Sequence, residues 1–251
     1  MEDLNIKNFR DIKGYVTREG LIMKPNMIYR GAPLNGLSDK EKNFLEQELN
    51  VKHIIDFRDE QEAMMMPDCC FENITYKRIG ALIGPTMQQG FDFGKLLQGD
   101  MTKRKLYSLL NYIEDGYKHM AFNNPAYHCL FSELLKNDGG VYFHCSAGKD
   151  RTGVAAFLIM MALDINEDDA ISEYLLSNEY LKESNDHLCD QLHIPMSLKK
   201  ECEPLLYVQK SFIDLTIQSI KNKYQNYDEF FFKEYQLDRQ TREKLKKIYC
   251  E

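Results

Sequence analysis

One cysteine and one arginine of the chain are spaced so that they could do chemistry together. Five residues separate Cys145 from Arg151, in a segment that reads His-Cys-Ser-Ala-Gly-Lys-Asp-Arg-Thr-Gly over residues 144–153. A loop of this length can curl until its backbone N–H groups converge on one centre, and a following helix adds the positive end of its dipole. Such a cradle binds a phosphate dianion. It also favours the thiolate, which is the nucleophilic form of cysteine.

The other side chains of this segment suit the same chemistry. The planar fork of Arg151 can hold two phosphate oxygens and follow them into the transition state. Gly148 permits the tight curl, the Thr152 hydroxyl can donate to the Cys145 sulfur, and His144 can orient the loop through its ring nitrogens. The backbone and the arginine supply the neutralising charge, so we expect no metal and no cofactor. The expected phosphate-binding residues are Ser146, Ala147, Gly148, Lys149, Asp150 and Arg151.

Particular elements must position this loop. Val141–Phe143 is a short apolar run after two glycines and predicts a strand, and the longest apolar run, Val154–Leu163, predicts a buried helix that begins at Thr152. Val51–Phe57 predicts a strand buried on both faces of a sheet. Asp56 and Arg58 lie where that strand ends, which is where α/β sheets place their sites. We expect these two residues either to support the site or to form a structural ion pair.

The rest of the chain predicts a mixture of strands and helices. The expected strands and turns are a hairpin over 15–22 and strands over 27–29 and 74–79. The expected helices are 38–49, which opens with a capping box, then 102–120, 126–136, 167–176, 208–224 and 239–249. This order favours an α/β fold with a central, mostly parallel sheet flanked by helices and a helical C-terminal part.

Composition limits the class of protein. The 251 residues carry a net charge of −7 without a basic tail, so no nucleic-acid partner is expected. No apolar run reaches about 18 residues, so we expect no stable membrane insertion.

The N-terminus lacks the pattern of a secretory signal, and the seven cysteines show no framework spacing. We therefore expect a cytoplasmic protein with reduced thiols. Without repeats or linkers, residues 1–251 predict a single domain.

The segment 144–153 resembles the phosphate-binding loop of the cysteine-dependent protein tyrosine phosphatase superfamily. Its Lys-Asp pair resembles that of the bacterial atypical tyrosine phosphatases, which also act on phosphoserine, phosphothreonine and phosphoinositides. The other segments that resemble this family are 8–15, 27–30, 54–58 with Glu62, and 173–178. The resemblance implies a tyrosine-phosphatase-like fold, Cys145 as nucleophile, Arg151 as phosphoryl ligand and Asp150 as general acid. It also implies that polar residues 183–206 form part of a lid.

The identity of the general acid stays open. The chain has no Trp, so it has no Trp-Pro-Asp loop to bring in a remote acid. Besides Asp150, the alternatives are one of three acids that precede the loop, Asp56, or no dedicated acid. The three preceding acids are Asp92, Asp100 and Asp115.

The expected partners are a phosphorylated protein or a phosphoinositide, with inorganic phosphate in the loop. A phenol of pKa near 10 leaves more easily than an aliphatic alcohol, which favours phosphotyrosine. A lysine in the middle of the loop resembles the pattern of phosphoinositide phosphatases, where it can contact a second phosphate, although Lys149 could equally be a solvated charge at the loop rim. Two different functions remain as alternatives: a phosphoprotein-binding module that traps without hydrolysis, and a rhodanese-type sulfurtransferase.

Overall fold

The computed structural model describes residues 4–85, 101–191 and 195–251. Its five strands form one sheet in the order β1-β2-β5-β3-β4. Their bounds are β1 Arg10–Asp11, β2 Ile28–Gly31, β3 Val51–Asp56, β4 Thr75–Arg78 and β5 Gly140–His144. All neighbours pair in parallel except β1, which runs antiparallel to β2 at the edge. The expected mostly parallel sheet is therefore confirmed.

The register places the end of β5 between the ends of its two neighbours. His144 pairs with Gly31 on β2 and with Asp56 on β3. Because parallel strands end at the same edge of a sheet, the segments after all three strands meet there. The loop that begins at Cys145 thus starts in the middle of this edge.

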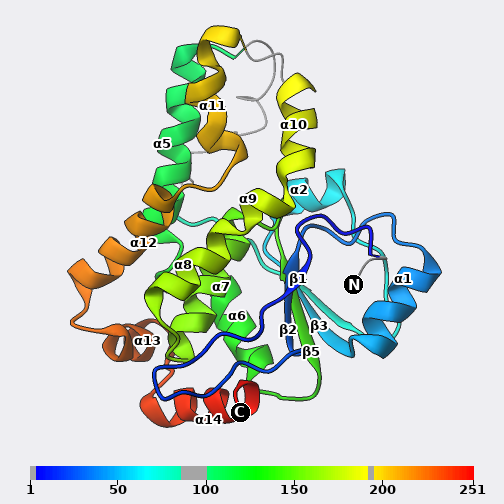
Figure 1. Cartoon of the computed structure of the whole chain (residues 1–251), viewed down its shortest axis with the longest axis vertical. Helices are drawn as coiled ribbons and strands as arrows, with labels where there is room; N and C mark the ends of the chain where they lie inside the picture. The colour runs from blue at the N-terminus through cyan, green and yellow to red at the C-terminus, as the bar shows by residue number, and fades with distance from the viewer. Residues whose placement is uncertain (1–3, 86–100, 192–194) are drawn as a thin grey trace.

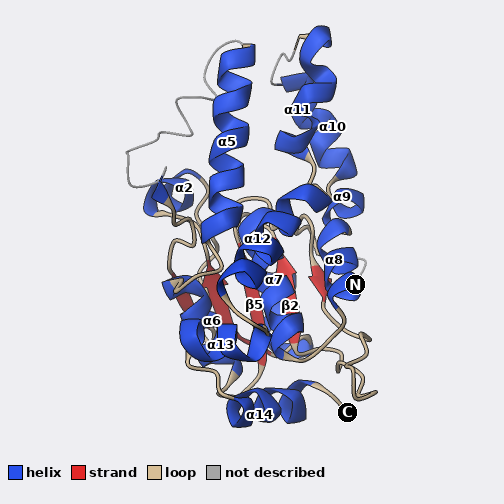
Figure 2. Cartoon of the chain, turned by 90° about the vertical axis from the view of Figure 1, so that its left-hand side faces the viewer, coloured by secondary structure: helices blue, strands red, loops and turns tan. Residues whose placement is uncertain are grey.

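Two hydrophobic cores cover the two faces of the sheet. Along β5, Val141 and Phe143 belong to the larger core, whereas Tyr142 between them belongs to the smaller one. Most helices pack over the first face, and α1 with the N-terminal segment covers the second (Figures 1 and 2). The helices are α1 Asp39–Asn43, α2 Glu60–Met65, α5 Lys103–His119, α6 Pro125–Leu134, α7 Asp150–Ala162, α8 Glu167–Leu175, α9 Ser177–Tyr180, α10 Lys182–Gln191, α11 Lys199–Leu206, α12 Lys210–Lys223, α13 Tyr227–Tyr235 and α14 Arg239–Tyr249, with a π-helical turn at Phe44–Glu48 and a 3-10 turn at Met196–Leu198.

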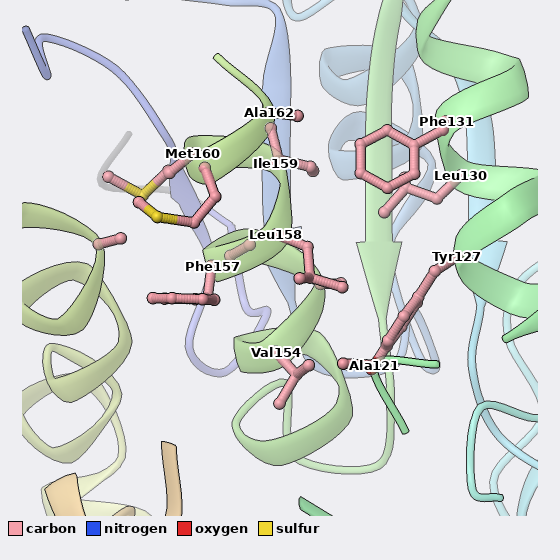
Figure 3. Packing of buried hydrophobic residues seen from close by; sticks show 14 of the residues in the cluster. Ala121, Tyr127, Leu130, Phe131, Val154, Phe157, Leu158, Ile159, Met160 and Ala162 are labelled. Carbon is pink, nitrogen blue, oxygen red and sulfur yellow. The ribbon is translucent and has the colours of Figure 1, made fainter. Parts of the chain in front are cut away.

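Helix α7 is the central helix of the larger core. All of its residues from Arg151 to Ala162 are buried, so it is apolar all round rather than amphipathic. Figure 3 shows Val154, Phe157 and Leu158 among this packing, with Leu130 of α6 nearby. A helix fixed on all sides gives the loop before it a rigid support.

The predicted elements agree with the structure at their centres and differ at some ends. The hairpin is present only as isolated bridges such as Val16 with Ile22. The capping box at Ser38 is present, but its helix continues as a π-helical turn. Helix α7 begins at Asp150, two residues before the expected start at Thr152. In the part of the chain that the structure describes, five helices were not expected: α2, α9, α10, α11 and α13.

Helices α5, α10 and α11 extend together beyond the sheet (Figures 1 and 2). A third, small core lies between α5 and α11, where Leu106 and Leu109 pack with Cys202. Residues 183–206, the expected lid, contain α11 and most of α10. Among the described residues, no helix has both the length and the apolar character needed to cross a bilayer.

Candidate active site

The loop at residues 145–149 joins β5 to α7 in a single tight curl. Cys145 lies at its start and is 2% exposed. Gly148 has a φ of +65°, and a Cβ there would collide with the carbonyl of Gly31, so only glycine fits. Helix α7 has no side-chain N-cap, which leaves its first N–H groups available to a ligand. The loop and the helix dipole therefore face the same centre.

Two side chains from the N-terminal segment bind the carbonyls of this loop. Asn8 Nδ2 donates to the carbonyls of Ala147 and Gly148 at 3.1 and 2.8 Å, and Arg30 donates to the Gly148 carbonyl at 2.7 Å. In a trans peptide the N–H points away from the C=O. The N–H groups of Gly148 and Lys149 consequently point away from Asn8 and Arg30. Convergent N–H groups are what an anion site requires.

A buried ion cluster holds these two side chains in place. Glu173 accepts from Arg10 Nε at 2.7 Å and from an Arg30 terminal nitrogen at 2.6 Å, and Arg10 also donates to the side chain of Asn8. Burial raises the pKa of Glu173, but the two guanidinium groups outweigh this and lower it below its usual value. Two arginines and one glutamate leave one net positive charge beneath the loop.

Arg151 is clamped by a carboxylate from another element. Its two terminal nitrogens donate to the two oxygens of Glu62 on α2, both at 2.6 Å, and to Ser146 Oγ and the Phe57 carbonyl. Ser146 Oγ itself donates to Glu62 at 2.6 Å. Burial raises the pKa of Glu62, but the hydrogen bonds and charge of Arg151 dominate and lower it to about 2. None of these arginine bonds uses Nε, which leaves that N–H for a phosphate oxygen.

His144 connects the loop to a second charged cluster. Its ring lies 3.3 Å from the Cys145 carbonyl through Nδ1 and 3.2 Å from Asp68 through Nε2. Arg58 donates to both Asp56 and Asp68 at 2.9 and 2.6 Å. Asp56 and Arg58 thus form a buried ion pair that lies next to His144, 3.8 Å from its ring through Asp56.

The same cluster has the residue types of a metal site. Ligand atoms of Asp56, Asp68 and His144 all lie within 4.8 Å of one another. The guanidinium of Arg58 already lies against both carboxylates and supplies the positive charge that an ion would bring. We therefore interpret the cluster as an ion-pair network.

Asp150 and Lys149 face different partners although they are adjacent. Asp150 Oδ1 accepts a hydrogen bond from Tyr117 at 2.8 Å. Lys149 Nζ donates to the carbonyls of Leu205 and Leu206 at the end of α11, at 2.7 and 3.0 Å. The lysine is thus bound to the expected lid segment and is not a free charge at the rim.

Thr152 differs from its expected role. Its hydroxyl is buried and has no hydrogen-bond partner among the described residues, so the expected bond to the Cys145 sulfur is not formed here. The early start of α7 places Thr152 inside the first helical turn.

The alternative acids are less well placed than Asp150. Asp92 and Asp100 lie outside the described residues. Asp115 is on α5 beside His119, with 3.2 Å between the side chains. Asp56 is fully buried against Arg58. Of the aspartates that the structure describes, Asp150 alone directly follows the loop, as the first residue of α7.

A small hollow opens beside Arg151. Its volume is about 190 Å³, and two aromatic residues, Phe57 and Tyr112, are among those that line it. A protein cavity of about 150 Å³ can hold benzene, so this hollow has room for one aromatic ring. The lining residues are Phe57, Asp59, Glu62, Gly80, Leu82, Tyr112 and Arg151. A larger cavity of about 560 Å³ lies among α12, α13 and α14, and no residue of the loop lines it.

Three contributors to the site were not assigned a role from the sequence. Asn8 lies in segment 8–15, which resembles the family, but nothing in the sequence indicates that its side chain contacts the loop. Glu62 also belongs to the resemblance, and the sequence does not indicate its partner. No sequence pattern indicates a role for Tyr117, because a single tyrosine in an amphipathic helix is typical of a core residue.

A convergent backbone loop at the carboxyl ends of parallel strands, with a cysteine at one end and an arginine at the other, has the features of a phosphate-handling α/β enzyme. A family model described as the tyrosine phosphatase family matches residues 3–251. The chain therefore belongs to the tyrosine phosphatase family and is a protein-tyrosine phosphatase.

The sequence identity to individual relatives is low. The chain is 27% identical over 221 residues to a Cupriavidus necator protein provisionally named a tyrosine-protein phosphatase, covering 86% of this chain and 76% of that one. It is 24% identical over 198 residues to the triple specificity protein phosphatase PtpB of Mycobacterium tuberculosis, covering 68% and 67%. Among solved structures, PTPMT1 in complex with PI(5)P matches with a TM-score of 0.33 and 14% identity, covering 79% and 96%.

Proposed function

We propose that this chain hydrolyses phosphomonoesters, above all phosphotyrosine, through a cysteinyl phosphate on Cys145. The observation that carries the proposal is the orientation of the loop. Asn8 and Arg30 bind its carbonyls on one side, so its N–H groups are free to neutralise a phosphate on the other.

The reaction comprises two in-line displacements. In the first, the Cys145 thiolate attacks phosphorus, an S–P bond forms, the P–O bond to the leaving group breaks, and Asp150 gives that oxygen its proton. In the second, water attacks phosphorus and gives a proton to Asp150, the S–P bond breaks, and inorganic phosphate leaves. Arg151 donates its Nε N–H to one equatorial oxygen throughout, while its two terminal nitrogens stay on Glu62, which fixes the orientation of the guanidinium.

Aryl phosphates are the substrates that these contacts favour. The hollow beside Arg151 suits one aromatic ring, and a phenolic leaving group needs the least help from an acid. Lys149 would have to leave the carbonyls at the end of α11 before it could contact a second ring phosphate. We therefore place phosphoserine, phosphothreonine and phosphoinositides after phosphotyrosine, although the name of the mycobacterial relative supports a broad range.

The remaining parts of the proposal concern the whole chain. We propose that residues 1–251 form one phosphatase domain, supported by the family match over 3–251. Segment 183–206 acts as a lid, supported by the contact of Lys149 with α11. A cytoplasmic location is supported by the six cysteines that the structure describes, which carry thiols rather than disulfides.

Phosphate release from a substrate panel tests the proposal. The panel contains phosphotyrosine, phosphoserine and phosphothreonine peptides and soluble phosphoinositides, each with and without EDTA, and Cys145→Ser is the control. We expect release that is greatest with phosphotyrosine, unchanged by EDTA and lost in the variant. Binding without release across the panel would favour a binding module, and sulfite from thiosulfate and cyanide would favour a sulfurtransferase.

A further inference from the structure

Tyr117 lies beneath the loop and bonds to the aspartate that the mechanism uses. It is on α5, fully buried, and its hydroxyl donates to Asp150 Oδ1 at 2.8 Å. The same hydroxyl lies 2.7 Å from that of Tyr174 on α8. Each tyrosine hydroxyl carries one proton. Since Tyr117 gives its proton to Asp150, Tyr174 must be the donor in the pair of tyrosines.

The ring of Tyr117 cannot move easily. It stacks on Phe212 with centroids 5.3 Å apart and meets Tyr174 edge to face at 6.3 Å. Thr216 donates to its backbone carbonyl at 2.6 Å. Four elements, α5, α7, α8 and α12, are therefore joined at this one side chain, and the position of its hydroxyl is set before any substrate binds.

The bond distinguishes the two oxygens of Asp150. Oδ1 accepts from Tyr117, whereas Oδ2 faces the Lys149 ammonium at 3.8 Å. Because Tyr117 donates to Oδ1 and the ammonium at 3.8 Å is too far away to donate to Oδ2, Oδ2 is the oxygen left to carry the acidic proton. Without Asp150, Tyr117 could donate to Tyr174, and Tyr174 could donate to the Gln209 carbonyl, which lies 3.4 Å away. The two hydroxyls therefore do not need Asp150 as an acceptor. The bond from Tyr117 to Asp150 instead orients the carboxyl group.

We propose that Tyr117 is a positioning residue that orients Asp150 so that its Oδ2 delivers a proton to the leaving group. The inference rests on the proposed function, in which Asp150 is the general acid. Its consequence is a dependence on the leaving group, because a poor leaving group needs a well-placed proton and a good one does not. A side chain that only filled space would slow all substrates alike.

The test compares Tyr117→Phe with Tyr174→Phe, which removes a hydroxyl of the same kind but leaves the bond to Asp150. For each variant, kcat/KM, which reports the first displacement, is measured with p-nitrophenyl phosphate and with a phosphoserine peptide. We expect Tyr117→Phe to lose roughly tenfold in kcat/KM on phosphoserine and less than about twofold on p-nitrophenyl phosphate. Tyr174→Phe should lose less than about twofold on both, and combining Tyr117→Phe with Asp150→Asn should cost no more than Asp150→Asn alone.

Asp150→Asn separates the two ways in which the inference can fail. If Asp150→Asn is selective for the poor leaving group but Tyr117→Phe is not, the positioning role is wrong and the proposed mechanism stands. If neither variant is selective, Asp150 is not the acid and both fail. Equal losses in Tyr117→Phe and Tyr174→Phe would also overturn the inference, because they would show a packing effect.

Discussion

The bidentate contact between Glu62 and Arg151 gives the site its most directly measurable electrostatic property. Glu62 is held as a carboxylate by bonds from Arg151 and Ser146, against the opposing effect of burial. Its pKa falls from 4.5 to about 2. A carboxyl group whose pKa is lower in the folded state stabilises the fold above its unfolded pKa, and that stability is lost as the pH falls toward the folded value.

The first prediction concerns this window. As the pH falls from 4.5 to 2, Glu62 becomes protonated and the wild type loses the stability that this carboxylate contributes, whereas Glu62→Gln has no carboxylate there to protonate. The difference in free energy of unfolding between the two proteins should therefore shrink by a few kcal/mol. Urea unfolding at steps of pH measures the difference. Glu60→Gln, on the exposed side of the same helix, is the matched control. A difference between wild type and Glu62→Gln that stays constant over the window would contradict the assigned pairing.

At the residue scale, the sequence predicted the residues of the loop but few of their partners. The spacing of Cys145 and Arg151, with glycine between them, follows from what the backbone needs to surround a phosphate. The contacts of Asn8, Glu62 and Tyr117 with the loop connect positions far apart in the chain. A local pattern contains no information on such contacts. The expected bond from Thr152 to the sulfur is absent for a related reason, because it depends on where α7 begins.

At the element scale, the loop and the C-terminal end of α11 are joined by one side chain. Lys149 places an ammonium on two carbonyls that the helix leaves without partners, and the positive charge also suits the negative end of the helix dipole. The lysine side chain is 12% exposed, so solvent weakens these bonds little. This contact joins the loop to segment 183–206, the expected lid.

The second prediction is that Lys149→Met loosens α11. Hydrogen bonds to a charged group contribute about 1.5–3 kcal/mol, so amide hydrogen exchange over 199–206 should become roughly tenfold faster or more. Mass spectrometry of the exchanged protein measures the rate. Lys210→Met, at an exposed ion pair on α12, should leave exchange in 199–206 unchanged. Equal protection of this segment in wild type and Lys149→Met would show that the contact does not hold the helix.

The two elements that position the loop could be predicted because each is a mostly apolar run. Val51–Phe57 and Val154–Leu163 are apolar because both faces of the strand and all sides of the helix are buried. Helix α13 was missed because its three consecutive phenylalanines, of which Phe232 is 54% exposed, show no helical period. Helix α11 was missed because its sequence is polar and contains Pro204.

At the scale of the whole molecule, the buried cluster of Arg10, Arg30 and Glu173 joins the N-terminal segment to α8. Ser177 adds a bond from Arg10 at 3.1 Å. Because Asn8 and Arg30 also bind the loop, the cluster connects the beginning of the chain, the phosphate loop and the helices that follow it. Such long-range contacts make the site depend on the folding of the whole sheet edge.

The third prediction is that Glu173→Gln destabilises the whole protein. Removing the carboxylate leaves two buried guanidinium groups without a counter-charge, at a cost of about 3–5 kcal/mol. The free energy of unfolding in urea measures this loss, and Glu179→Gln, at an exposed position nearby, should change it by less than about 0.5 kcal/mol. A loss below about 1 kcal/mol in Glu173→Gln would mean that the cluster does not support the fold.

The layered α/β architecture could be predicted at this scale, but the long-range cluster could not. A chain that mixes strands with helices, and in which one strand is apolar enough to be buried on both faces, indicates a mostly parallel sheet. The pairing of two arginines with Glu173 depends instead on β1 running antiparallel at the sheet edge, and Arg10–Asp11 is too short to read as a strand.

The central claim is that Cys145 forms a covalent phosphoryl intermediate, and trapping it is the most direct test. Wild-type protein is mixed with excess phosphotyrosine peptide, quenched within the first turnovers and analysed by peptide mass spectrometry, with Cys145→Ser treated in parallel. We predict one phosphoryl group on the peptide that contains Cys145, and a loss of turnover of roughly 10⁴-fold or more in the variant. Continued phosphate release by Cys145→Ser, or a phosphoryl group on another residue, would contradict the account.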